Sequence, residues 1–510
     1  MLGLVAAVVV LVVSIALYLK GTASRERLPP GPRGSIIAGN AFQVPRSEPW
    51  IWCAELQKQY GDVVYLSVFG RPMIILNSLE AINDLLVKRS SIYSDRPRAV
   101  MAGKIMGVGR TTPLAPYGDY WRAQRRLWHE HLGKKATLNY SDFISQESKA
   151  SCFRLLDLAL SAQQTTYSEL RLLTVKLLLG MTYGMKVDSL EDDYVAVTDA
   201  SSRDIIESFT PGRYLVDVMP FLNYLPSWFP GAGWKRFGLG VRNRLDKLAY
   251  EPYRRMQLNP NDGEMHSLTR GMIENPIADD ETQIWVAGAV YGGGADTLHS
   301  SLNRLLVVLA LFPEAQQRAQ EEIERVVGDD RIPDSNDHDS LPYVAALIQE
   351  VLRWNIIGPL GIPRMTTEDD EYKGYRIPKG SIVLANYWNI AQDPKIYPNP
   401  DDFVPERFLR SDDPETHPQL DSRTFAYSVG RRFCPGQWFA DSTLYHLAVT
   451  ILATCIVSKP IDENGAEYEP HVKFSGLSLR EMEPFSVRVR ARSPQALDLL
   501  RASPVAELSG

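Results

Sequence analysis

Most of the chain follows the apolar spacing of α-helices. Apolar residues recur at intervals of three and four positions, which places them on one face of a helix. The spacing predicts long helices over residues 170–180, 282–311 and 313–327. It also predicts one helix that carries Trp121 and another that follows Leu341.

Strand-like segments are fewer and shorter. Residues 63–68 and 73–76 are rich in strand-forming side chains, and the turn residues between them, Gly70-Arg71-Pro72, predict a hairpin. Further strands are expected within residues 375–385 and 472–489. The fold class expected from the pattern is therefore mainly α with a small β portion.

The start of the chain has a different pattern. Residues 2–19 are almost uniformly apolar and would form a helix ~27 Å long, close to the hydrocarbon thickness of a thin bilayer. Basic residues follow this run and none precedes it, so the positive-inside rule places the rest of the chain in the cytosol. A cleaved signal peptide is the alternative, but it would have a basic start and a shorter apolar core. We predict a transmembrane anchor over residues 1–20 and a basic, proline-rich hinge over residues 21–32.

Composition narrows the class of protein. The chain has 510 residues, of which 45% are apolar and 23% charged, as in an ordinary globular protein with a large core. Its four cysteines are too few and too scattered for a disulfide framework, which favours a reducing compartment. The net charge of -6 argues against nucleic acid as the main partner.

Candidate chemistry is concentrated in residues 427–436, which read Y-S-V-G-R-R-F-C-P-G. If Cys434 holds a metal, Gly430 allows a positive-φ turn close to a flat ligand, and Pro435 suits the first turn of a helix. The free N–H groups of that turn, together with the helix dipole, favour a thiolate. The planar guanidinium of Arg432 can donate two parallel hydrogen bonds to a carboxylate such as a haem propionate. The alternative is a buried free cysteine beside a helix start.

This stretch closely resembles the haem-binding loop of the cytochrome P450 family, whose pattern is F-x-x-G-x-R-x-C-x-G. Tyr427 stands where the pattern has phenylalanine; an aromatic ring is kept, so only the local packing is expected to differ. The resemblance implies that Cys434 is the axial thiolate ligand of a haem (heme) iron. It also implies that Gly430, Arg432 and Gly436 bind the cofactor.

A second motif lies in the longest predicted helix, where residues 287–297 read A-G-A-V-Y-G-G-G-A-D-T. Three consecutive glycines in a helix cost roughly 3 kcal/mol relative to alanine, which predicts a close approach or a local distortion. The segment resembles the family's [AG]-G-x-[DE]-T pattern, which implies that Asp296 and Thr297 relay protons to dioxygen. Leu298 follows where the family often has a hydroxyl residue, so the relay has less redundancy. The alternative is a weakened helix with an ordinary surface aspartate.

Trp121 and Arg125 lie four positions apart, on one face of their predicted helix. Alone, this pair is as well explained by a core tryptophan beside a solvated arginine. In the resembled family such a pair binds the haem propionates, and Arg364 stands where many members place another propionate partner.

Glu350 and Arg353 form E-x-x-R, which alone is an ordinary surface ion pair. With Arg407 in the downstream Pro-Glu-Arg-Phe segment, it resembles the family's buried triad behind the cysteine loop. Residues 208–234, rich in proline and aromatics, are either a loop packed on the core or a lid that dips into the membrane interface. The tail from Ser493 is expected to be loosely held.

Five motifs occur in the family's order, and the resemblance covers nearly the whole chain. It implies a single haem domain over residues 33–510, preceded by the transmembrane helix, in the cytochrome P450 fold. Its location would be the endoplasmic reticulum membrane, single-pass, with the catalytic domain facing the cytosol.

The function implied is a haem-thiolate monooxygenase that inserts one oxygen atom from O2 into a lipophilic organic substrate. Likeness to fungal members suggests a secondary metabolite or an aromatic xenobiotic. NADPH electrons would arrive through a separate cytochrome P450 reductase that docks near Arg122, Arg126 and Arg431, with cytochrome b5 as a further candidate partner. The alternatives are a same-fold isomerase or peroxide-using enzyme without electron input, and a non-enzymatic haem carrier or sensor.

Overall fold

The structure is a computed structural model that describes residues 28–158, 164–210, 212–259, 266–409, 419–476 and 479–501. The predicted anchor over residues 1–20 lies outside the described residues, as does most of the hinge. Among the residues that are described, no helix is both long enough and apolar enough to cross a membrane. The chain divides into two compact units: one contains the chain up to Pro97 with Pro359–Ile390 and Val429–Arg431, and the other contains the rest. The single haem domain therefore stays a prediction.

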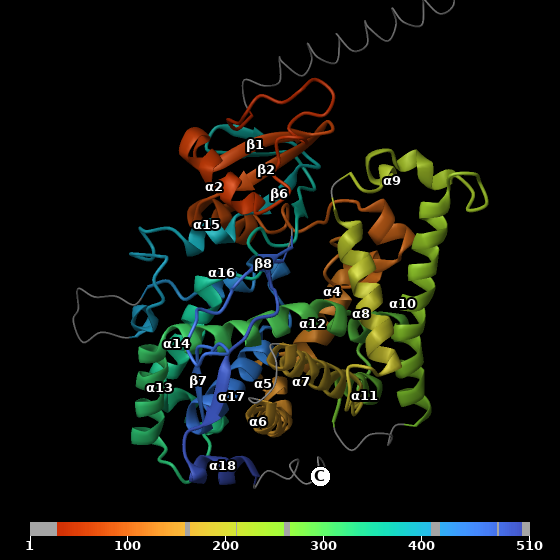
Figure 1. Cartoon of the computed structure of the whole chain (residues 1–510). Helices are drawn as coiled ribbons and strands as arrows, with labels where there is room; N and C mark the ends of the chain where they lie inside the picture. The colour runs from red at the N-terminus through yellow and green to blue at the C-terminus, as the bar shows by residue number, and fades with distance from the viewer. Residues whose placement is uncertain are drawn as a thin grey trace, which may run out of the picture. The chain divides into compact units, whose positions relative to one another are not determined.

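The first unit is built around a four-stranded sheet in the order β1-β2-β6-β3 (Figure 1). Its strands are β1 (Val63–Val68), β2 (Arg71–Leu76), β6 (Ile382–Ala385) and β3 (Arg364–Met365). The predicted hairpin is confirmed, with Phe69 and Gly70 at φ 48° and 76° forming the turn between antiparallel β1 and β2. Its second strand begins two residues earlier than predicted, at Arg71. Cys53 and Leu56 of α2 (Pro49–Tyr60) pack against the buried face of this sheet.

The segment expected to form strands within residues 375–385 contributes to two different sheets. Its end forms β6, which runs parallel to β2, whereas β5 (Tyr375–Ile377) pairs with β4 (Asp370–Tyr372) in a separate two-stranded ribbon. The same unit also contains the short helix α3 (Leu79–Ile82), the π-helical segment η2 (Asn83–Lys88) and most of α15 (Tyr387–Ala391).

The second unit is mostly helical, which confirms the predicted fold class. Its helices are α4 (Asp119–Leu132), α5 (Lys134–Thr137), α6 (Ser141–Leu158), α7 (Gln164–Tyr183), α8 (Asp193–Ser208), α9 (Leu215–Val218), α10 (Gly233–Leu258), α11 (Leu268–Glu274), α12 (Asp280–Leu311), α13 (Pro313–Val326), α14 (Pro342–Trp354), α16 (Arg423–Ala426), α17 (Gln437–Thr454) and α18 (Pro494–Arg501). Two short ribbons join them: β7 (Cys455–Ser458) with β10 (Arg488–Ala491), and β8 (Phe474–Ser475) with β9 (Glu481–Met482).

Helix α12 runs through the middle of this unit, where it packs against α7, α10, α14 and α17 (Figure 1). It begins at an N-cap, since the Asp279 carboxylate accepts the Thr282 N–H at 2.8 Å. The helix continues through its glycine run without interruption. A Cβ on Gly294 would lie 2.9 Å from Leu178 of α7, whereas one on Gly292 or Gly293 would meet nothing within 4 Å. The predicted close approach is therefore found at Gly294.

The expectation of a loosely held tail from Ser493 is wrong over its first part. Residues Pro494–Arg501 form α18, in which Ala496 and Leu500 are buried against the helical core. These two apolar residues lie four positions apart and so share one helix face. The proline- and serine-rich composition of the tail concealed this spacing.

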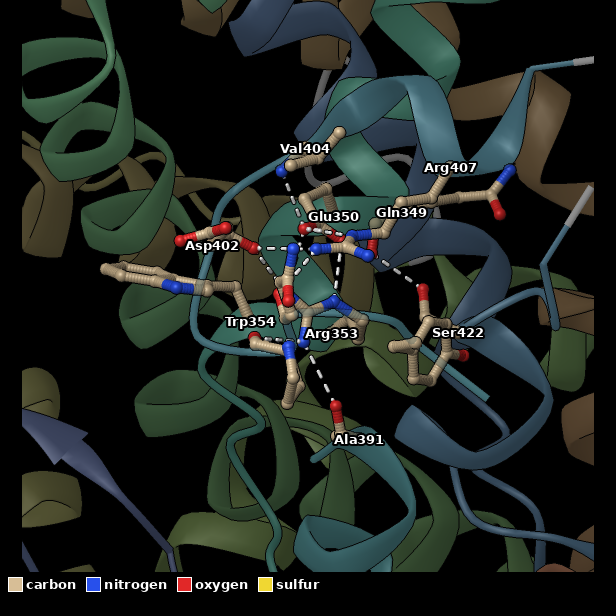
Figure 2. Close-up of polar contacts among 12 residues, drawn as sticks. Gln349, Glu350, Arg353, Trp354, Ala391, Asp402, Val404, Arg407 and Ser422 are labelled. Carbon is tan, nitrogen blue, oxygen red and sulfur yellow. Dashed lines mark hydrogen bonds and ion pairs between the residues drawn. The ribbon is translucent and has the colours of Figure 1, made fainter. Parts of the chain in front are cut away.

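The predicted triad is confirmed in the second unit (Figure 2). Arg353 makes a two-pronged ion pair with Glu350, from Nε to Oε2 at 2.7 Å and from Nη2 to Oε1 at 2.8 Å. Arg407 Nε donates to Glu350 Oε1 at 3.3 Å, and so does the Val404 N–H at 2.9 Å. The Glu350 and Arg353 side chains are fully buried, so this is an interior network rather than a surface pair.

The network carries two arginines for one glutamate, and backbone carbonyls accept the remaining guanidinium protons. Arg353 Nη1 donates to the carbonyls of Ala391 and Pro400 at 3.0 and 2.8 Å. The carbonyl of Asp402 accepts from Arg353 Nη2 at 3.0 Å and from Arg407 Nη2 at 3.2 Å. The triad thereby fixes an irregular segment that has no helix or strand of its own to satisfy its carbonyls.

We predict that Arg353→Ala lowers the free energy of unfolding, because it removes the two-pronged ion-pair partner of the buried Glu350 carboxylate. Removing one partner of a buried charge network costs roughly 3–5 kcal/mol, a large share of the stability of most domains. Denaturant unfolding followed by circular dichroism measures the loss. Arg318→Ala is the matched control, since Arg318 is 58% exposed in its pair with Glu406 and its removal should change little. A variant lacking Arg353 that unfolds like the wild type would contradict the structural role of the triad.

Candidate functional site

The loop between α16 and α17 is closed by one backbone hydrogen bond. The Cys434 N–H donates to the carbonyl of Tyr427 at 2.8 Å, and Ser428 and Gly430 take positive φ angles of 64° and 61°. A Cβ on Gly430 would lie 2.1 Å from the carbonyl oxygen of Leu86, so only glycine fits. The predicted positive-φ glycine is confirmed, and the neighbour that requires it is a backbone carbonyl rather than a ligand.

The helix after the cysteine starts later than the sequence suggested. Gly436 is the N-cap and α17 begins at Gln437, so Pro435 precedes the cap and does not occupy the first turn. Burial raises the pKa of the Cys434 thiol, whereas the backbone N–H groups of Gly436 and Gln437 lower it. The predicted support of a thiolate by the helix start is present, but burial outweighs it in the protein alone.

Two arginines gather around the ring of Trp121. The Arg432 guanidinium lies 4.5 Å from the centre of this ring and donates to the carbonyls of Thr112 at 3.2 Å and Ala115 at 2.8 Å. Arg125, one turn after Trp121 on α4, lies 5.9 Å from the same ring. The structure therefore brings Trp121, Arg125 and Arg432 together, as the sequence predicted.

Arg125 also lies beside the cysteine loop. It donates to the carbonyl of Phe433 at 2.9 Å and stacks over the ring of that residue at 4.4 Å. Burial lowers the pKa of Arg125, and the charge of Cys434 opposes that effect. In the described part of the chain no carboxylate pairs with Arg125. A half-buried cation beside a thiol is suited to receive an acidic group from a ligand.

Arg364 is described with the first unit. It is buried, and its Nη2 donates to the carbonyl of Val429 at 2.6 Å. Burial lowers the pKa of Arg364, while Tyr387 raises it. The predicted contact of Arg364 with a propionate stays a prediction.

Asp296 and Thr297 lie on α12 just after the glycine run. The Thr297 hydroxyl donates to the carbonyl of Gly293 at 3.0 Å, within the glycine run itself. Asp296 Oδ1 forms an ion pair with Arg171 Nη1 of α7 at 2.9 Å, and Nη2 of the same arginine pairs with Asp199 at 2.7 Å. Asp296 is thus neither an isolated surface residue nor free of partners.

Sequence reasoning missed Arg171 and Asp199. Burial lowers the pKa of Arg171, but the charges of Asp199 and Asp296 outweigh burial and raise it overall. Tyr291 adds a hydrogen bond from its hydroxyl to Asp199 at 2.9 Å. An arginine within the apolar helix over residues 170–180 was the available signal, because such a residue needs a buried acidic partner.

Comparison with known proteins identifies the family and the fold. The family model for Cytochrome P450 matches residues 29–480. The chain belongs to the cytochrome P450 family. Cytochrome P450 monooxygenase claR of Ampulloclitocybe clavipes is 38% identical, with 96% of this chain and 91% of the relative covered. Cytochrome P450 monooxygenase COX2 of Coprinopsis cinerea is 36% identical, covering 96% of this chain and 94% of the relative.

A solved zebra fish cytochrome P450, described with abiraterone, shares the fold. It has a TM-score of 0.69, 22% identity, and covers 87% of this chain and all of its own. With several monooxygenases among the relatives, the protein is a cytochrome P450 monooxygenase. Family membership also implies a haem held by a cysteine thiolate, with NADPH as the electron source through a reductase.

Of the four cysteines, Cys434 fits the haem best. Cys53, Cys152 and Cys455 are buried within hydrophobic clusters, and burial raises the pKa of Cys53 to about 12. Cys434 lies at the start of a helix, where the charge of Arg125 and the backbone N–H groups of Gly436 and Gln437 lower the pKa of its thiol against the effect of burial. The donor set of a thiol with nearby guanidinium groups matches a haem and its propionates.

We predict that Cys434→Ser loses the thiolate-type absorption band of the reduced carbon monoxide complex, because a hydroxyl is a far poorer donor to iron. A difference spectrum of the purified variant measures it. Cys53→Ala is the control, and it should retain both haem content and band position. A thiolate band that persists in Cys434→Ser would assign the ligand to another cysteine.

Proposed function

We propose that this cytochrome P450 is membrane-anchored and inserts one oxygen atom from O2 into a lipophilic organic substrate. The substrate class is a secondary metabolite or an aromatic xenobiotic, and electrons come from NADPH through a separate reductase. The observation that carries the reaction class is the Asp296–Thr297 pair at the glycine run of α12, with its charged partners in place.

The haem, when bound through its thiolate, supplies the electron density that favours cleavage of the O–O bond. Thr297 supplies a hydroxyl that can pass a proton on while it donates to the Gly293 carbonyl. The Asp296 side chain is 25% exposed and therefore able to exchange protons with water. Arg171 Nη1 pairs with Asp296 Oδ1 at 2.9 Å, so we propose that Asp296 moves out of this ion pair when it passes a proton to Thr297.

The substrate side of the proposal is supported by an apolar cluster in the second unit. The π-helical segment Val100–Ile105 (η3), α9 and α10 bury Val100, Met101, Val216 and Val241 against one another. Asp217 of α9 ties these elements together, since its carboxylate accepts the N–H groups of Val100 and Met101. A substrate that reached these side chains would meet apolar groups, which is consistent with the lipophilic substrate that we propose.

The same region supports a membrane contact. Large apolar side chains of residues 208–234 are exposed, and they are Phe209, Leu215, Val218, Met219, Phe221, Tyr224, Trp228 and Phe229. So many exposed aromatic side chains favour a segment that dips into the membrane interface over a loop packed on the core. With the predicted anchor, this supports single-pass attachment to the endoplasmic reticulum membrane with the catalytic part in the cytosol.

The reductase contact is proposed on α4. Arg122 and Arg126 lie one turn apart on this helix and are both exposed, whereas Trp121 is buried. Arg122 is already paired with Asp119 at 2.6 Å, which leaves Arg126 as the stronger candidate for an acidic partner. The role of Arg431 in reductase docking stays a prediction, and so does cytochrome b5 as a further partner.

We predict that Thr297→Ala uncouples electron use from product formation. The variant keeps the helix, because alanine is a better helix former than threonine, but it loses the hydroxyl that Leu298 cannot replace. NADPH consumption with added reductase should continue, hydrogen peroxide should rise, and product per NADPH should fall several-fold. Added peroxide should partly restore product. The assay measures NADPH, peroxide and product in the same reaction.

Ser301→Ala is the matched control for this experiment. Its hydroxyl lies one turn further along α12 and donates to the Thr297 carbonyl at 2.9 Å, so its loss should leave coupling unchanged. Unchanged coupling in Thr297→Ala would argue against the relay and would favour the isomerase or peroxide-using alternative.

We predict that deletion of residues 1–27 releases the protein at least partly from membranes and leaves its spectrum unchanged. The reason is that this segment supplies the apolar span and none of the haem-site residues. Membrane flotation measures the release from membranes, and the reduced carbon monoxide difference spectrum measures whether the haem site is unchanged. Loss of haem on deletion would show that the segment is structural rather than an anchor.

A further inference from the structure

Two histidines from different parts of the chain meet beside Gly271 of α11. A Cβ on Gly271 would lie 2.9 Å from Nδ1 of His131 and 3.5 Å from Cε1 of His266, the ring atom between its two nitrogens. His131 is in the last turn of α4, and His266 lies just before Ser267, the N-cap of α11. Because Gly271 has no side chain, a nitrogen-bearing edge of each imidazole can lie next to the same point.

Polar atoms near this point have no partner from the protein. Nε2 of His131 is buried and, within the described ranges of the chain, accepts or donates no hydrogen bond. In the same part of the chain the hydroxyl of Tyr140 is also unpaired; this residue is 1% exposed, and its ring centre lies 6.1 Å from that of His266. Since buried polar groups in proteins are nearly always paired, a polar ligand at this point would stabilise the arrangement.

The charges around the two rings favour neutral imidazoles. Burial lowers the pKa of His131; the charge of Glu130 opposes this effect, and that of His266 adds to it. Neighbouring imidazoles that are both protonated repel each other, and the neutral ring is the form that binds metal ions. His266 is exposed, so an ion from the solvent can reach the pair.

The donor atoms select a class of ion. Imidazole nitrogen suits Zn²⁺, Cu²⁺ and Ni²⁺, whereas Mg²⁺ and Ca²⁺ prefer oxygen ligands. Across the described residues, no three His, Cys, Asp or Glu side chains are grouped for a metal, so water would complete the coordination here.

We propose that His131 and His266 bind one divalent transition-metal ion, such as Zn²⁺, where α4 meets α11. The bound ion joins α4, the helix that carries Trp121 and Arg125, to α11, which itself packs against α7 and α10. It therefore stabilises the folded protein by mass action. The proposal is independent of the haem ligand, the substrate and the reductase.

The test titrates Zn²⁺ into the haem-loaded protein by isothermal calorimetry, without reductase, and records the melting temperature with and without the ion. The wild type should bind one Zn²⁺ per chain at micromolar concentration, and its melting temperature should rise. His131→Ala and His266→Ala should each weaken binding by at least about tenfold and lose this rise. Gly271→Ala keeps both imidazoles but places a Cβ 2.9 Å from His131 Nδ1, so it should weaken binding as well.

His129→Ala is the matched control. His129 is an exposed histidine in the same last turn of α4, and it lies two positions before His131, so the two side chains do not share a helix face. Its removal should leave both the affinity for Zn²⁺ and the rise in melting temperature unchanged.

Three results would overturn the proposal. One is wild-type affinity for Zn²⁺ in His131→Ala or in His266→Ala. The second is binding by the wild type that requires millimolar Zn²⁺, which would mark an adventitious ion only. The third is an equal loss of affinity in His129→Ala, which would show a general effect of surface histidines. If His131→Ala fails to fold, His266→Ala decides the matter, because the His266 side chain is exposed.

Discussion

The fully buried ion pair between Glu350 and Arg353 is the interaction on which the cysteine loop depends. Arg407 joins it, and the backbone of Arg407 accepts the N–H of Gln419 at 2.9 Å. Ser422, at the start of α16, donates to the carbonyl of Gln349 on α14 at 2.7 Å. The triad is thus linked through α14 and residues 419–422 to the helix that immediately precedes Tyr427. This series of contacts connects the triad to the segment that leads into the cysteine loop.

The site combines groups whose charges are balanced in different ways. Carbonyls and rings surround Arg125, which leaves its charge available to an acidic ligand, whereas Asp199 and Asp296 neutralise Arg171. The first arrangement suits a permanent cofactor. In the second, Arg171 keeps Asp199 as a partner if Asp296 moves away, because the two aspartates pair with different nitrogens of the guanidinium.

Sequence reasoning succeeded where the determinants are local. The long helix predicted over residues 282–311 and the hairpin at Gly70 follow from spacing and turn chemistry, whereas the order of motifs was recognised by resemblance to the family. It failed where the decisive partner is remote in sequence: Arg171 lies 125 positions before Asp296, and no pattern links the two. The predicted start of α17 was also wrong: Pro435 was expected in the first turn, but it lies just before the N-cap. At Tyr427 only the shape of the ring was considered, and the hydroxyl was overlooked; it donates to Oδ1 of Asp441 on α17 at 2.6 Å.

The central claim is that this cytochrome P450 transfers one atom of O2 to a lipophilic substrate using electrons delivered by a reductase. The most direct measurement supplies 18O2 to the full-length protein with reductase, NADPH and a panel of lipophilic aromatic compounds, and scores products by mass. We expect products that carry a single 18O atom and that disappear when NADPH is omitted. Products formed without NADPH, or rearranged without any gain of oxygen, would contradict it.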